Sequence, residues 1–167
     1  KLEQKLSTGE QRIVRLLKRG DLAGIEAVNS GSQYQHDAIA ITTVKMCKIP
    51  AEIVIDFSTK SLELHANLME KWQKALAASD TWVTKLSTGP SRHRVARLLI
   101  WLAETCYKEQ FILPSRKDTG NILALTTETV SRLIAEMRRD ELLELHKGGY
   151  ATVNLGALKR IVKEDDA

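Results

Sequence analysis

Three polar residues, Glu128, Ser131 and Arg132, have the types and the spacing to contact nucleic-acid bases. On a helix, residues three and four apart share one face. Arginine can donate two parallel hydrogen bonds to guanine O6 and N7, glutamate can accept one from cytosine N4, and serine can do either. A good bidentate contact discriminates between bases by about 1–3 kcal/mol, whereas a surface pair between Glu128 and Arg132 contributes about 0.2–0.5 kcal/mol. Taken alone, these residues are better explained by the surface pair than by base recognition. The predicted elements around them must therefore show whether they form a nucleic-acid-binding surface.

The helix that would carry these residues is predicted over 126–140. Thr126 can accept a hydrogen bond as its N-cap, which places Thr127 and Thr129 in the first turn. Apolar residues fall on the side opposite Glu128, at Val130, Leu133, Ile134 and Met137. The sequence therefore predicts a helix with a buried back and a short polar edge.

The neighbouring segments predict the other parts of a winged helix. A short helix is expected at 115–123, and two strands at 142–146 and 150–154 are joined by the hairpin turn Lys147-Gly148-Gly149. Two further helices flank this group, one capped by Ser91 and the other at 155–161. The first of these has one apolar face, formed by Val95, Leu98, Leu99 and Leu102. Residues 111–114 are expected to be extended. Helix, helix and hairpin in this order are typical of a winged helix-turn-helix.

A long helix is predicted over 60–88, because no Gly or Pro interrupts it before Gly89-Pro90. Residues alternating three and four apart form a coiled-coil seam: Leu62, His65, Met69, Trp72, Leu76, Ser79, Val83 and Leu86. We expect this seam to pair with a second copy of the chain. The alternative is that the helix packs on its own β-domain.

The first fifty residues predict strands and turns. Residues 11–18 and 38–49 are rich in β-branched side chains, and the second run ends at Pro50. An isolated pair of strands would expose its apolar face, so we expect the chain to begin inside an antiparallel β-domain whose earlier strands are missing. The expected class is α+β, with domains at 1–58, 59–88 and 89–167.

Composition narrows the class of protein. The 167 residues carry a formal charge of +4 and are 43% hydrophobic and 28% charged, as in a globular protein. No apolar run could span a bilayer, and no leader segment is recognisable. Two cysteines do not suggest a disulfide framework, so a cytoplasmic location is expected. Phosphate loops, nucleophile elbows and His-Glu-x-x-His helices are missing, which argues against an enzyme.

Residues 125–132, Leu-Thr-Thr-Glu-Thr-Val-Ser-Arg, resemble the recognition-helix signature of the bacterial Crp/Fnr family in its Fnr-type form. Residues 20–24, Gly-Asp-Leu-Ala-Gly, resemble a turn of that family's β-roll sensor, and Pro50 matches the junction with its dimerisation helix. The resemblance covers nearly the whole chain. It implies a partial β-roll similar to cyclic-nucleotide-binding domains, a long dimerisation helix and a C-terminal winged helix-turn-helix.

The same resemblance implies a transcription regulator that binds double-stranded DNA as a homodimer. The expected site is an inverted repeat of TTGAT-like half-sites, with RNA polymerase as a further partner and no membrane. Bases would be read by Glu128, Ser131 and Arg132. Phosphates would be contacted by Ser115, Arg116, Thr127, Thr129 and either His146 or Lys147. The dimerisation residues would be Leu62, Met69, Trp72, Leu76, Val83 and Leu86. A signal in the β-roll would change the pairing of the long helices. The effector, the target genes and the sign of regulation stay unassigned.

Some residues depart from the family pattern. Ala124 replaces a usual glycine, and Thr119 replaces a usual apolar residue. Residues 37–39, Asp-Ala-Ile, stand where cyclic-nucleotide binders carry Arg-Ser-Ala, and Ile25 replaces an expected Glu. Without that Arg to neutralise a phosphate, cyclic AMP is not the expected ligand.

Cys47 aligns with a cysteine that helps to hold an iron–sulfur cluster in some members. Such a cluster needs four thiolates, three of which would have to precede the first residue. A lone cysteine on a strand is more often a small buried apolar residue, and Cys106 is expected in a core near Trp101. The cofactor stays unassigned, and no metal site is predicted.

A dimeric protein- or ligand-interaction module without specific DNA binding is the competing hypothesis. It predicts that Arg132→Ala leaves function unchanged.

Overall fold

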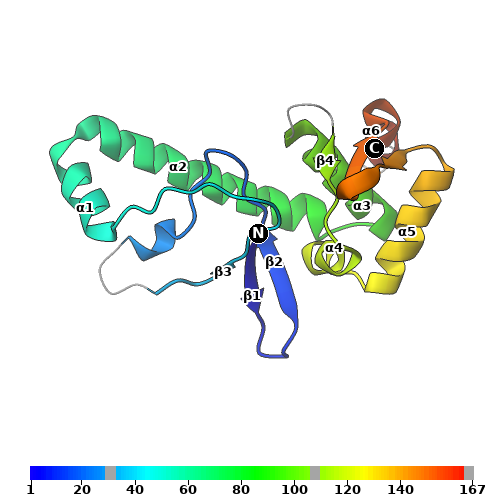
Figure 1. Cartoon of the computed structure of the whole chain (residues 1–167), viewed down its shortest axis with the longest axis horizontal. Coiled ribbons are helices and arrows are strands. Elements are labelled where there is room, and N and C mark those ends of the chain that lie inside the picture. The colour runs from blue at the N-terminus through cyan, green and yellow to red at the C-terminus, as the bar shows by residue number, and fades with distance from the viewer. Residues whose placement is uncertain (29–32, 106–109, 164–167) are drawn as a thin grey trace. The chain divides into compact units, whose positions relative to one another are not determined.

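The computed structural model describes residues 1–28, 33–105 and 110–163. The chain divides into two compact units, residues 1–81 and residues 82–167, each with its own helices and antiparallel sheet. Figure 1 shows the elements of both units in chain order.

The N-terminal unit contains a small sheet in the order β2-β1-β3. Strands β1 (Leu2–Lys5) and β2 (Gln11–Arg15) form an antiparallel hairpin, and β3 (Asp37–Ala38) pairs with the start of β1. The short 3-10 helix η1 (Ile25–Ala27) follows Gly24, whose φ of 76° is the left-handed conformation that glycine adopts easily. Leu2, Ile13 and Leu16 are buried.

The predicted strand at 38–49 is wrong. Strand β3 ends at Ala38, and residues 39–50 form no strand. The apolar residues of this segment are exposed, from 41% for Ile41 to 82% for Met46. β-branched residues favour a strand only where a neighbouring strand supplies a ladder and a half-buried surface, and β3 has such a neighbour only at Leu2 and Glu3. Cys47 is exposed in this segment, so the interpretation of it as a buried strand residue is also wrong.

The predicted single helix over 60–88 is divided in the structure. Helix α1 (Ala51–Lys60) follows Pro50, and α2 (Leu62–Thr81) begins after Ser61. Ser61 is extended, with φ −130° and ψ 110°, and its Oγ accepts a hydrogen bond from the backbone N–H of Leu64 at 3.2 Å. Serine thus acts as an N-cap for α2, a break that the absence of Gly and Pro did not reveal. Lys71 of α2 donates to the backbone carbonyl of Gly20 at 2.9 Å, which ties the helix to the β-part of this unit.

The C-terminal unit begins with a turn of π-helix, η2 (Trp82–Leu86), and continues with α3 (Ser91–Thr105). Ser91 is the first helical residue of α3, so its predicted role as the cap before the helix is off by one position. Next come β4 (Phe111–Ile112), α4 (Arg116–Leu123) and α5 (Thr127–Arg139). The remaining elements are β5 (Leu143–Leu145), the turn η3 (Lys147–Gly149), β6 (Tyr150–Val153) and α6 (Leu155–Lys163).

The C-terminal unit has a well-filled core around α3, which contacts α4, α5, α6 and β6 (Figure 1). The strands pair in the order β4-β6-β5, so the extended piece predicted at 111–114 becomes the third strand of the wing sheet. Side chains that are at most 1% exposed fill the interior: Val95, Leu98, Leu99, Phe111, Ile122, Leu123, Val130, Ile134, Met137 and Leu158. Cys106, predicted near Trp101, lies outside the described residues.

Within the described parts of the chain, no helix combines the length and the apolar character needed to cross a bilayer.

Candidate nucleic-acid interface

The start of α5 is fixed by a threonine cap. The side-chain oxygen of Thr126 accepts a hydrogen bond from the backbone N–H of Thr129 at 3.2 Å, as predicted. The Thr126 hydroxyl donates to Thr129 Oγ1 at 3.1 Å, which leaves the Thr129 hydroxyl proton available to another acceptor. Thr127 is exposed beside it. The first turn of α5 thus has a satisfied cap and two hydroxyl groups near its outer surface.

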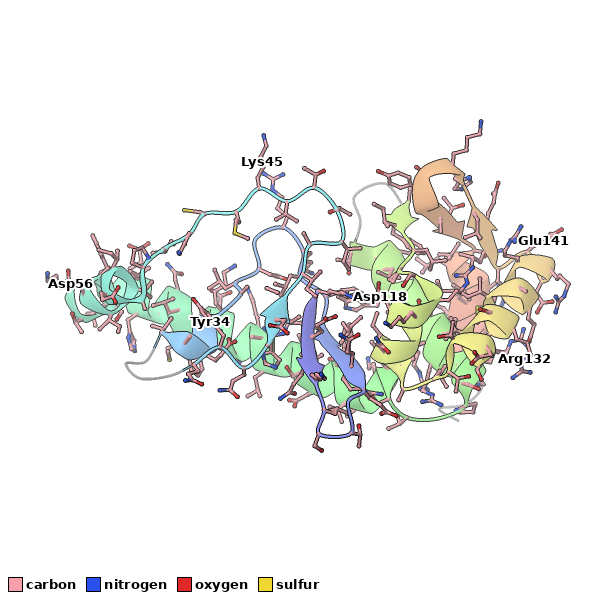
Figure 2. All side chains as sticks on the ribbon, turned by 60° about the horizontal axis from the view of Figure 1, so that its bottom comes forward. Tyr34, Lys45, Asp56, Asp118, Arg132 and Glu141 are labelled. Carbon is pink, nitrogen blue, oxygen red and sulfur yellow. The ribbon has the colours of Figure 1, made fainter. Side chains whose placement is uncertain are left out.

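Helix α5 separates a buried side from an exposed side. Val130, Leu133, Ile134 and Met137 are at most 4% exposed, whereas the three predicted base-reading residues, Glu128, Ser131 and Arg132, are all exposed. Figure 2 shows Arg132 pointing away from the interior of the unit. Among the residues that the structure describes, Glu128 and Arg132 form no ion pair with each other. The surface pair considered from the sequence is therefore not formed, and both side chains can bind an outside partner.

Ser115 is the N-cap of helix α4: its Oγ accepts from the backbone N–H of Asp118 and donates to Asp118 Oδ2, both at 3.0 Å. The Ser115 hydroxyl is thus engaged inside its own helix start. Arg116, the next residue, is half-buried. Burial lowers the pKa of the Arg116 guanidinium, and the nearby positive charge of Arg138 lowers that pKa further.

The turn between α4 and α5 is tight at two residues. Ala124 has φ 53° and ψ 49°, a left-handed conformation that disfavours any side chain, and the Leu125 N–H donates to the Gly120 carbonyl at 3.1 Å. A Cβ atom on Gly120 would lie 2.5 Å from the Leu125 carbonyl oxygen, so this position needs glycine. Thr119 is buried, and its hydroxyl donates to the Pro114 carbonyl at 3.3 Å. Both departures from the family pattern are thus accommodated, Thr119 by a hydrogen bond and Ala124 at a conformational cost.

The wing presents His146 and Lys147 differently. His146 Nε2 lies 2.8 Å from Thr152 Oγ1, and its Nδ1 lies 3.8 Å from a carboxylate oxygen of Glu144. Lys147 is exposed in the turn, where Gly148 and Gly149 have φ of 76° and 80°. These left-handed glycines allow the hairpin to reverse within three residues. The histidine ring is therefore held inside the wing, while the lysine extends from its tip.

Two arginines that the sequence analysis did not single out orient the helix-turn-helix. Arg92 bridges Glu136 of α5 and Asp140, the C-cap of that helix, at 3.4 Å and 2.8 Å. Arg94 donates to the Leu123 carbonyl at the end of α4, at 2.8 Å. Both arginines lie in the first turn of α3, where the helix dipole disfavours a cation. This unfavourable position in the sequence could have indicated that each arginine has a partner elsewhere in the chain. It does not indicate which residue that partner is.

The predicted dimerisation residues differ in exposure. Leu62 is 90% exposed, Trp72 is 42% exposed and Leu76 is 65% exposed, and Met69 and Val83 are exposed as well. Leu86 is 2% exposed and lies in the core of the C-terminal unit, so it is not available to a partner.

The π-turn η2 explains the burial of Leu86. It places Trp82 and Leu86 together on the inner side and leaves Val83 outside. Trp82 meets Trp101 edge to face, with ring centroids 5.8 Å apart. The predicted seam therefore ends before Leu86.

Together, a capped helix-turn-helix, an exposed polar edge on its second helix and a three-stranded wing define a winged helix-turn-helix protein. Residues 93–161 match the model of the Crp-like helix-turn-helix domain. Two solved structures agree with this at the level of fold. FixK2 from Bradyrhizobium japonicum superposes with a TM-score of 0.80 at 23% identity, over 95% of this chain and 80% of that one. A CRP-family transcriptional regulator from Thermus thermophilus superposes with a TM-score of 0.81 at 22% identity, over 97% of this chain and 82% of that one.

The helix-turn-helix of this chain matches the Crp-like domain, and the chain is similar in sequence to Fnr-type regulators, in line with the resemblance noted from the sequence. The fumarate and nitrate reduction regulatory protein of Vibrio cholerae is 31% identical over 151 residues, which are 87% of this chain and 60% of that protein. The anaerobic regulatory protein of Aggregatibacter actinomycetemcomitans is 29% identical over 153 residues, 88% of this chain and 59% of that protein. The chain therefore spans about three fifths of these relatives. The predicted α+β class, with a partial β-roll and a winged helix-turn-helix, is confirmed.

Proposed function

We propose that this protein is a sequence-specific DNA-binding transcription regulator of the Crp/Fnr type. The observation that carries the proposal is the exposed edge of α5 formed by Glu128, Ser131 and Arg132, on a helix whose opposite side is core. In this proposal α5 enters the major groove, Arg132 binds guanine and Glu128 accepts from cytosine. The predicted division into domains at 1–58, 59–88 and 89–167 is part of the proposal.

The protein would act as a homodimer on an inverted repeat with TTGAT-like half-sites. Exposed apolar residues at helical spacing on α2, notably Met69, Trp72 and Leu76, support pairing between two copies. A dimer would set the two recognition helices about 34 Å apart, one turn of DNA. Leu86 is left out of this interface because it is buried in its own unit.

Phosphate contacts would position the protein on the duplex without reading its sequence. Of the predicted set, Arg116, Thr127, Thr129 and Lys147 keep donors that can reach a phosphate. The Ser115 hydroxyl and the His146 ring already have hydrogen-bond partners within the chain. Each would have to contact a phosphate in addition to its present partner.

Control of activity would come from a signal in the N-terminal unit that changes how the α2 helices pair. One relative named above is an anaerobic regulatory protein, and a comparable signal is our hypothesis for this chain. RNA polymerase is the proposed further partner and the cytoplasm the proposed location, since both follow from regulation of bacterial genes.

The test is DNA binding measured by fluorescence anisotropy. Duplexes with a TTGAT…ATCAA repeat and a scrambled control are titrated with wild type and Arg132→Ala, at about 50 and 200 mM salt. We expect wild type to prefer the repeat and Arg132→Ala to lose that preference. Equal binding of wild type to both duplexes would contradict specific reading, and absence of binding at low salt would favour the protein-interaction module instead.

A further inference from the structure

The base-reading edge of α5 continues as a straight stripe to the last residue of the helix, Arg139. Arg139 follows Arg132 by seven residues, which place it within about 20° of the same direction and about 10 Å further along the helix axis. Ala135 lies between them on the stripe, and all three residues are exposed. Figure 2 labels Arg132 within this stripe and Glu141 just beyond its end. The side of α5 that carries the predicted base-reading residues therefore ends in a second arginine.

A groove adjoins the end of this stripe on the side of the wing. It has a volume of about 460 Å³ and lies between the C-terminal half of α5 and strand β5. Its lining residues are Ala135, Arg138, Arg139, Leu143, Glu144 and Leu145. Because Ala135 and Arg139 belong to both the stripe and the groove, a molecule that lies along the base-reading edge meets the groove directly.

The charged residues of this groove are two arginines and one glutamate, Glu144. Neither Arg138 nor Arg139 forms an ion pair within the parts of the chain that the structure describes. Glu136, three residues before Arg139, is the acid that helical spacing would pair with it. That carboxylate lies 3.4 Å from the Arg92 guanidinium instead. The groove therefore has an excess of positive charge and a guanidinium that is available to an outside anion.

We propose that this groove holds the DNA backbone beside each half-site, with the Arg139 guanidinium bound to a phosphate. This inference rests on the proposed function, and it adds a phosphate contact at the C-terminal end of the recognition helix. A guanidinium binds two phosphate oxygens through a planar pair of N–H groups. The DNA backbone alternates charged phosphates with apolar sugar carbons, and the groove offers arginines beside Ala135 and Leu145.

The position of Arg139 on α5 favours DNA as the occupant. A recognition helix contacts bases with its N-terminal residues, in a major groove about 12 Å wide. Arg139 lies eleven residues beyond Glu128, a rise of about 16 Å along the helix. When Glu128 contacts a base, Arg139 therefore lies at the border of the major groove, where the phosphates are. An acidic protein segment would also suit the charges, but its binding would not require Arg139 to lie in line with Glu128 and Arg132.

The test is the salt dependence of DNA affinity in the full chain. For the TTGAT…ATCAA repeat and the scrambled duplex, log Kd is plotted against log salt for wild type and Arg139→Gln. Each phosphate contact contributes about 0.9 to the slope, so a dimer that loses Arg139 from both copies should lose about 1.8. Both duplexes should weaken by the same factor, because a phosphate contact carries no sequence information.

Ethylation of single phosphates in the repeat locates the contact on the DNA. An ethyl group removes the charge of a phosphate, so wild type should bind more weakly when the phosphate that Arg139 contacts is ethylated. Arg139→Gln should bind that ethylated duplex and the unmodified repeat with the same affinity, because the contact is missing in both.

Two further variants separate charge from structure. Arg139→Lys keeps the charge and should keep the slope of wild type. Arg160 is a matched residue, an exposed arginine in the last turn of α6, which packs on α3. Arg139→Gln and Arg160→Gln each remove a cation that the helix dipole favours, so their Tm should fall by similar amounts. Only Arg139→Gln should change the slope.

Glu144→Gln tests whether the phosphate lies in the groove. Removal of a carboxylate beside a bound phosphate should tighten binding to both duplexes by about two- to fivefold per copy at about 50 mM salt. Glu141→Gln is the matched control, because Glu141 is also exposed but does not line the groove. It should change the affinity less than Glu144→Gln does.

An unchanged slope in Arg139→Gln would overturn this inference, and so would a loss confined to the repeat. Equal affinities of Glu144→Gln and Glu141→Gln would also overturn it, because the phosphate would then lie outside the groove. If Arg132→Ala abolishes preference for the repeat while Arg139→Gln changes nothing, the proposed function stands without this contact, and an acidic protein segment becomes the better occupant. If wild type binds neither duplex, both proposals fail.

Discussion

The two compact units of the chain bury their apolar side chains to very different degrees. In the C-terminal unit, each helix from α3 to α6 contributes fully buried apolar residues. In the N-terminal unit, the helices α1 and α2 contribute none, and the buried apolar residues of its described part are Leu2, Ile13 and Leu16. Large apolar residues of this unit are instead exposed, among them Ile39, Ile41, Val44, Met46, Ile49, Ile53 and Phe57.

This contrast indicates that the two units obtain their stability differently. A run of exposed apolar residues usually marks a surface that another part or another molecule covers. The helix-turn-helix has a complete core of its own, and it needs no such cover to hold Arg132 in place. The exposed apolar residues of the N-terminal unit are available to whatever other part or molecule covers them.

The largest expected effect comes from a matched pair of isoleucines, Ile122 in the C-terminal unit and Ile49 in the N-terminal unit. Ile122 is fully buried and Ile49 is 56% exposed. Ile122→Ala should lower the free energy of unfolding by about 2–5 kcal/mol, because it leaves a cavity in a packed core. Ile49→Ala should change it by less than about 0.5 kcal/mol. Urea unfolding of both variants measures the difference. Equal losses in the free energy of unfolding would show that the two units do not differ in how tightly their apolar residues are packed.

A smaller effect is expected on association through α2. Leu76 is 65% exposed on the proposed dimer face, and Ala78 is an exposed residue two positions further, on the opposite side of the helix. Leu76→Glu should weaken dimerisation by about 100-fold, because the interface loses two leucine side chains, one from each copy, whose burial contributes about 1.5 kcal/mol or more each. Ala78→Glu introduces the same charge and should leave the dimer intact.

Sedimentation velocity over a range of protein concentrations measures this shift. A dimer that survives Leu76→Glu would mean that the exposed face of α2 is not the interface. The exposed apolar surface of the N-terminal unit would then need an explanation other than dimerisation.

Sequence patterns predicted the C-terminal unit better than the N-terminal unit, because the C-terminal unit has a complete core of its own. Thr126, Val130 and Met137 mark the cap and buried side of α5 through local rules, and the tertiary structure follows those rules. The run at 38–49 had strand-forming residues but lacked a neighbouring strand, which local composition does not reveal. The extended conformation at Ser61 and the π-turn that buries Leu86 likewise depend on the backbone conformation of a few residues. The spacing of apolar residues along a helix does not reveal that conformation.

The site shows the same division between local and long-range information. The spacing of Glu128, Ser131 and Arg132 was sufficient to place them on one exposed face. The salt bridges of Arg92 join residues far apart in the chain, and no spacing rule predicts such pairs.

The smallest expected effect tests whether the C-terminal unit is itself free of strain. Ala124 before α5 and Glu141 after it both have positive φ, at 53° and 55° (Figure 2 labels Glu141). A left-handed conformation costs a residue with a side chain about 1–2 kcal/mol, and the greater freedom of glycine in the unfolded chain offsets part of what its introduction would gain. Ala124→Gly and Glu141→Gly should therefore each raise the free energy of unfolding by about 0.5–1 kcal/mol.

Thermal unfolding would show this gain as a higher Tm in each variant. Gly156→Ala is the reverse exchange at an uncrowded helical position, and it should also raise Tm, because glycine inside a helix is less favourable than alanine. The sign of a glycine–alanine exchange would then follow the backbone conformation at each position. A lower Tm in Ala124→Gly would mean that the turn before α5 is not strained and that the alanine contributes packing of its own.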